Sequence, residues 1–185
     1  MKADKTIIQE TTNWLKSVVI HFNFCPFAKR ELDSNRIRFS VCHATQLETF
    51  LEVLIQECEY LDTHSDTETT LLISPYAFME FDDYLIALEL AQALLETQGY
   101  DGTYQLASFH PDYCFDNSDN NDPANYTNRS PYPMIHILRE ASLESALEHF
   151  EQPELIPEHN IENAREAGII KLRAILESCY SNKKN

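Results

Sequence analysis

The stretch from residue 111 to residue 133 holds the densest set of side chains that could bind or transform a small molecule. It follows His110 directly, and its second half contains the candidate ligand-binding residues Asn125, Tyr126, Asn128, Arg129 and Ser130. A guanidinium presents five donors in a planar fork that suits a carboxylate or a phosphate. An imidazole can serve as a general acid or base. The segment therefore predicts a site for a small anionic molecule, with His110 as the candidate catalytic residue.

The same loop also has a purely structural interpretation. Loops of more than about 12–15 residues without internal structure are usually functional or disordered, and four aromatic side chains between residues 113 and 132 argue against disorder. Its Asn and Ser side chains could instead satisfy the loop's own backbone. Arg129 could pair with Glu140 or with an Asp of the loop. The sequence leaves both interpretations open.

Two further places could carry chemistry. Cys25 precedes Lys29 and Arg30, and nearby cations would stabilise a thiolate, although its phenylalanine neighbours favour core packing. His136 lies in an apolar run, on the face opposite its isoleucine neighbours, where a structural histidine is the competing interpretation. We keep Cys25, Lys29, Arg30 and His136 as secondary candidates.

Several familiar sites are excluded. The three glycines, at positions 99, 102 and 168, cannot form a GxGxxG or GxxxxGK[ST] loop, so neither a P-loop nor a standard dinucleotide site is present. No HExxH, GxSxG or closely spaced metal set occurs, so no metal ligands are assigned and no cofactor is identified. A metal site that uses His110, His136 or Cys114 is a weaker alternative.

The elements that must position these residues follow from periodicity. Alternating or continuous apolar runs predict strands over residues 36–42, 69–74, 104–109 and 134–138. Helical spacing predicts helices over residues 6–20, 47–58 and 81–95, a short helix over 143–150, and a long final helix over about 157–180.

Strands that alternate with helices predict a single α/β domain over residues 1–185, with an about four-stranded, largely parallel sheet flanked by helices. The direction of the fourth strand is not determined, because no clear helix precedes it. In such sheets, ligands bind beyond the carboxyl ends of the strands. If the fourth strand is parallel, His43, His110 and Arg139 share that edge, and Arg139 joins the anion site.

The charge balance bears on partners and compartment. With 14 Lys and Arg against 30 Asp and Glu, the net charge is −16, which disfavours nucleic acid and anionic membranes as partners. No apolar run of 18 residues and no signal-peptide pattern occurs, and the five cysteines form no CxxC pair. A cytoplasmic location is therefore expected, and nothing indicates the oligomeric state.

Five segments resemble a bacterial family known as domain of unknown function 1415: NFCPFA (23–28), TTLLISP (69–75), FDDYL (81–85), QLASFHPDYCF (105–115) and NYTNRSPYPMIHILREAS (125–142). The resemblance spans nearly the whole chain. It implies a cytoplasmic bacterial protein, and the family has no established activity to transfer.

The first hypothesis is therefore an enzyme-like pocket that binds a small anionic molecule through His110, Arg129, Arg139 and the 111–133 loop. The alternative is a non-catalytic binding or protein-interaction module in which the loop's Tyr and Arg side chains dock a partner.

Overall fold

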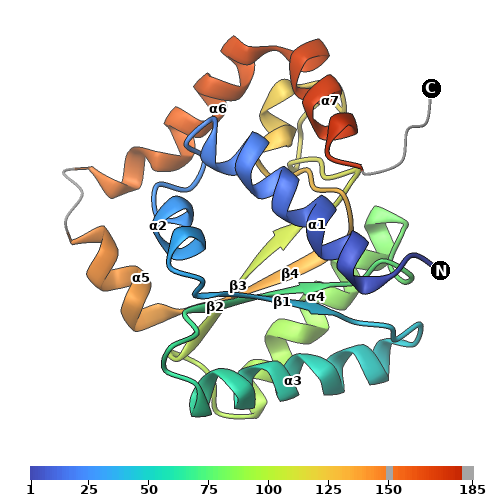
Figure 1. Ribbon diagram of the computed structural model, residues 1–185, viewed down its shortest axis with the longest axis vertical. Helices are drawn as coiled ribbons and strands as arrows, with labels where there is room; N and C mark the ends of the chain where they lie inside the picture. Colours follow the sequence, from blue (N-terminus) through green and yellow to red (C-terminus); the bar gives the residue numbers. More distant parts are fainter. Residues whose placement is uncertain (149–151, 181–185) are drawn as a thin grey trace.

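The computed structural model describes residues 1–148 and 152–180, and the strands within these ranges form one sheet with helices on both faces (Figure 1). The strands are β1 (Ile37–Val41), β2 (Thr69–Ile73), β3 (Tyr104–Phe109) and β4 (Met134–Arg139). Each begins and ends within one residue of its predicted position. The fold is a single α/β domain, as expected.

The sheet is mixed, so the prediction of a largely parallel sheet is wrong. Its order is β1-β2-β4-β3; β1 and β2 are parallel, and β4 is antiparallel to both β2 and β3. The reason lies in the connections. Helices carry the chain back across the sheet after β1 and β2, but the 111–133 loop contains no such crossover. The chain therefore re-enters at the edge where β3 ended, and β4 runs the opposite way.

The two crossover helices cover one face of the sheet. They are α3 (Leu47–Thr63) and α4 (Phe81–Thr97). Leu72, Ile135 and Ile137 point from the sheet into this core, where each is fully buried.

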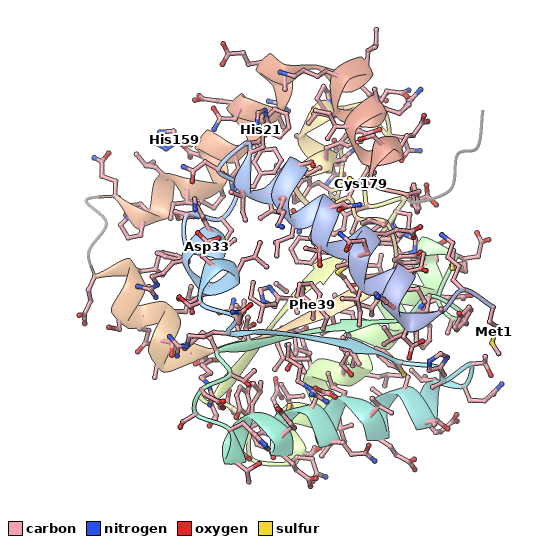
Figure 2. The ribbon with its side chains drawn as sticks, viewed as in Figure 1. Met1, His21, Asp33, Phe39, His159 and Cys179 are labelled. Carbon is pink, nitrogen blue, oxygen red and sulfur yellow. The ribbon has the colours of Figure 1, made fainter. Side chains whose placement is uncertain are left out.

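The remaining helices lie on the opposite face (Figure 1). They are α1 (Asp4–Trp14), its π-helical continuation η1 (Leu15–Ile20), α2 (Ala28–Asp33), α5 (Glu140–Leu147), the short 3-10 turn η3 (Pro153–Leu155), α6 (Ile156–Ala167) and α7 (Ile169–Ser178). Figure 2 shows the Phe39 side chain of β1 on this side of the sheet, where it packs against the core. None of the helices in the described residues has both the length and the apolarity to cross a bilayer.

Two helix predictions need correction. The expected single C-terminal helix is two helices, because Gly168 adopts φ 78° and ψ 150°, a conformation that only glycine tolerates well. The predicted helix over 143–150 is α5, which begins three residues earlier and ends at Leu147; Phe150 lies outside the described residues.

The 111–133 loop is ordered and has structure of its own. It contains the 3-10 helix η2 (Pro123–Thr127), whose first turn is capped where Asp122 accepts a hydrogen bond from the Ala124 N–H at 2.9 Å. The turn packs against α6, and Tyr126 and Tyr132 are buried. The loop therefore packs against the carboxyl ends of β2 and β3, where the Ser74 N–H donates to the Pro133 carbonyl and the His110 N–H donates to the Asn128 carbonyl.

Candidate functional site

His110, the candidate catalytic residue, is fully buried and fully hydrogen-bonded. Its Nδ1 accepts a hydrogen bond from the Asp112 N–H at 3.0 Å, and its Nε2–H donates to the Phe78 carbonyl at 2.9 Å. Burial lowers its pKa, and the rings of Phe81 and Tyr84 flank it. The structure thus holds a neutral imidazole whose two nitrogens are both committed to the backbone.

Arg139 lies at the other edge of the sheet, because β4 runs opposite to β3. His43 and His110 follow strands that end at the same edge, as expected, but the antiparallel β4 places Arg139 at the opposite edge, so the expectation is wrong for Arg139. The Arg139 guanidinium donates to the Leu61 carbonyl at 2.5 Å and to the Thr67 carbonyl at 3.2 Å. It thereby caps the C-terminus of α3, where unpaired carbonyls and the helix dipole favour a cation.

Arg129 cross-links the loop that contains it. Its Nε donates to the Tyr113 carbonyl at 3.0 Å, and its Nη2 donates to the Asn120 carbonyl at 2.9 Å. The guanidinium also lies over the Tyr126 ring, 4.9 Å from its centre. The planar fork that suggested an anion clamp is occupied by backbone oxygens.

The polar residues near Arg129 serve the loop in the same way. Asn125 is fully buried; it accepts from the Phe115 N–H at 3.0 Å and donates to the Asp119 carbonyl at 2.9 Å. Asn128 and Ser130 also donate to backbone carbonyls, at 3.0 and 2.7 Å. These contacts match the structural interpretation of the loop.

The structure places an apolar cavity elsewhere, on the face of the sheet opposite α3 and α4. A cavity of about 390 Å³ lies between the sheet and the helices α1, η1, α2, α5 and α6. Its lining is mostly apolar and includes Trp14, Val19, Leu71, Phe109, Leu143 and Ile156. Ligand pockets are typically about 300–1,000 Å³ and mainly apolar, so this volume suits a small molecule.

Four residues singled out in the sequence line this cavity together: Cys25, Arg30, His136 and Arg139. The sequence did not mark the other important members, Trp14, Thr69 and Phe109. Each belongs to an ordinary apolar or strand pattern, so no local signal distinguishes a cavity wall from a packed core.

Cys25 does not have the environment of a reactive thiolate. Lys29 forms an ion pair with Asp33, and Arg30 donates to Glu31 at 2.7 Å, so both cations are partnered by carboxylates. Burial raises the pKa of the Cys25 thiol. The cavity therefore contains a neutral thiol at this position.

His136 is held in a defined orientation on the cavity floor. Its Nε2 lies 2.6 Å from the Thr69 Oγ1, which in turn lies 2.5 Å from the Ile137 carbonyl. Burial lowers the pKa of His136 to about 4, so the imidazole is neutral at pH 7. Although β4 is an interior strand, His136 remains partly exposed, because it faces the cavity.

The cavity adjoins a charged group of side chains near the surface. A second hollow of about 400 Å³, lined by Arg30, Arg36, Glu68 and residues of α5, shares part of its lining with the cavity. Arg36 forms ion pairs with Glu68 and with Glu31, the latter at 3.4 Å. The charges of two cations and two carboxylates thus compensate one another beside the cavity.

The structure also bears on the two alternatives drawn from the sequence. His110 packs beside α4 and His136 faces the cavity, so they lie on opposite sides of the sheet, and the described residues contain no group of three or more potential metal ligands. Tyr126 and Tyr132 are buried rather than presented to a partner. The large exposed apolar side chains instead include Met79, Leu85, Ile86 and Leu90, in or beside α4.

Comparisons with known proteins give one match. A family model described as a protein of unknown function (DUF1415) matches residues 6–174, a range that includes both the cavity and the loop. The curated proteins and the solved structures give no match.

Proposed function

The chain belongs to the DUF1415 family of proteins of unknown function, and we propose that it binds a small, largely apolar molecule in the cavity between the sheet and helices α1, α2 and α5. The observation that carries this proposal is the cavity itself: about 390 Å³, walled by aromatic and aliphatic side chains, with few polar groups. Apolar cavities of this kind bind apolar molecules, because little water has to be displaced.

The protonation states of the titratable side chains in the cavity favour binding over acid–base catalysis. A general base is most effective when its pKa is close to the working pH, and burial holds the pKa of His136 at about 4. Burial also keeps the Cys25 thiol protonated. Neither group has the activation that proton transfer or nucleophilic attack at neutral pH requires.

The anionic ligand expected from the sequence has less support. It would use the guanidinium groups of Arg129 and Arg139 together with His110. All three side chains are committed to backbone groups, and Arg139 lies at the opposite edge of the sheet.

The proposal is tested by titration with N-phenyl-1-naphthylamine, a neutral dye whose emission rises in apolar surroundings. The wild-type chain should bind it saturably with one site. Ala107→Phe places a ring on the cavity floor and should weaken binding at least tenfold. Ala93→Phe, on the exposed side of α4, adds the same ring outside the cavity and should bind like the wild type.

Two outcomes would contradict the proposal. One is the absence of saturable dye binding by the folded wild-type chain. The other is equal binding by Ala107→Phe and the wild type, which would place the dye outside the cavity, for example on the exposed apolar side chains of α4.

A further inference from the structure

The orientation of His136 can be fixed atom by atom. A threonine hydroxyl has one proton, and the Thr69 Oγ1 gives it to the Ile137 carbonyl at 2.5 Å. The same oxygen must therefore accept from the His136 Nε2, which lies 2.6 Å away and carries the ring proton. The other ring nitrogen, Nδ1, is left with a lone pair.

That lone pair has no partner among the residues that the structure describes. Within residues 1–148 and 152–180, Nδ1 of His136 makes no hydrogen bond, whereas the imidazole remains partly exposed to the cavity. An acceptor in apolar surroundings is costly until it receives a hydrogen bond. The cavity floor thus presents one oriented, unfilled acceptor.

Three nitrogen-bearing side chains that line the cavity donate hydrogen bonds elsewhere. The Trp14 Nε1–H donates to the Arg129 carbonyl at 2.8 Å, Arg30 donates to Glu31, and Arg139 donates to the end of α3. No side chain within the described residues donates to the His136 Nδ1, so its donor has to come from a bound molecule or from water.

We infer that the cavity selects neutral, largely apolar molecules that carry a hydroxyl or N–H group, which donates to Nδ1 of His136. This inference rests on the proposed function and narrows it to one ligand class. A purely hydrocarbon ligand leaves the acceptor unfilled, and a carboxylate brings only further acceptors. A phenol or an apolar alcohol supplies the missing proton.

The test compares 2-naphthol with 2-methylnaphthalene, which differ by a hydroxyl in place of a methyl group. Each displaces N-phenyl-1-naphthylamine from the wild type and from His136→Phe, which keeps a ring without an acceptor. The ratio of the two affinities, naphthol over methylnaphthalene, should fall about tenfold in His136→Phe. Using the ratio removes the general difference in hydrophobicity between the two compounds.

A second pair of variants guards against a folding defect. Thr69→Val removes the hydroxyl that orients His136 and should lower the ratio at least threefold. Thr70→Val makes the same change one residue along β2, where Oγ1 is buried and has no hydrogen-bond partner within the described residues, and should leave the ratio unchanged. If His136→Phe does not fold, the affinity ratios of Thr69→Val and Thr70→Val test the inference on their own.

The failures can be told apart. A wild-type chain that does not bind the dye overturns the proposed function. A wild-type chain that binds the dye, with an affinity ratio that neither His136→Phe nor Thr69→Val changes, overturns only the selectivity for a donor.

Discussion

Two histidines in this protein, His110 and His136, have the same side chain and opposite surroundings. Both nitrogens of His110 bond to the backbone, whereas one nitrogen of His136, on the cavity floor, has no hydrogen bond to any described residue. In the sequence, His110 precedes a polar loop and looks like the functional residue, and His136 sits in an apolar strand and looks structural. The difference depends on partners that are distant in sequence, Phe78 for one and Thr69 for the other.

The low pKa of His136 predicts a pH-dependent stability. The unfolded chain protonates this residue near pH 6.5, whereas the folded chain does so only near pH 4. Between these values the unfolded state binds more protons, so the contribution of His136 to stability falls as the pH falls. Relative to His136→Phe, the wild type should lose about 2–3 kcal/mol between pH 7 and pH 4.5.

Urea unfolding of both chains at several pH values measures this effect. The comparison cancels the other titrating groups, among them His110, whose pKa is also lowered. Parallel profiles of unfolding free energy against pH for the two chains would contradict the prediction, because His136 would then have the same pKa in the folded and the unfolded chain.

Arg129 predicts a stability effect rather than a binding effect. Its two hydrogen bonds to loop carbonyls and its stacking on Tyr126 hold the 111–133 segment together. Arg129→Ala should lower the unfolding free energy by about 2–3 kcal/mol. Arg173→Ala, at an exposed position of α7, should change it by less than about 0.5 kcal/mol. Equal stabilities in denaturant melts would instead favour a ligand-facing Arg129.

At the scale of elements, the sequence predicts the local structure well and the assembly less well. All four strands follow from short apolar runs, because the alternation of side chains is a local property. The direction of β4 depends on the edge of the sheet at which the 111–133 loop returns the chain, and no periodic pattern within the loop indicates that edge. That one reversal moves Arg139 to the far edge and separates it from His110.

The break between α6 and α7 shows the same limit. Apolar spacing continues through Gly168, so periodicity predicts one helix, but the backbone there adopts φ 78° and ψ 150°. Gly168→Ala should therefore cost about 1–3 kcal/mol through backbone strain alone, because a Cβ at this position meets no atom of the described residues within 4 Å. Thermal or urea unfolding measures it. A stabilised Gly168→Ala chain would mean that the two helices can merge.

At the scale of the whole molecule, the cavity has a cost in stability. Apolar side chains that line a cavity lose contacts that a packed core would provide. Neither the volume nor the position of the cavity could be predicted, because both result from how α1, α2, α5 and α6 pack over one face of the sheet. The sequence nominated Cys25 with Arg30 as one candidate and His136 as another, without indicating that all three line one cavity.

Filling the cavity should therefore separate stability from binding. Ala107→Phe should raise the unfolding free energy by about 1 kcal/mol while it weakens dye binding. Ala93→Phe, exposed on α4, should change neither property appreciably. A loss of several kcal/mol in Ala107→Phe would indicate that the space beside Ala107 is too small for a ring.

The most direct measurement is a crystal structure of the chain soaked with 4-iodophenol, an apolar ring with one hydroxyl donor and one strong anomalous scatterer. The iodine should lie among Trp14, Phe109 and Leu143, with the phenol oxygen within hydrogen-bond distance of the His136 Nδ1. Iodine sites confined to the surface, with side chains filling the space above His136, would contradict a ligand-binding cavity.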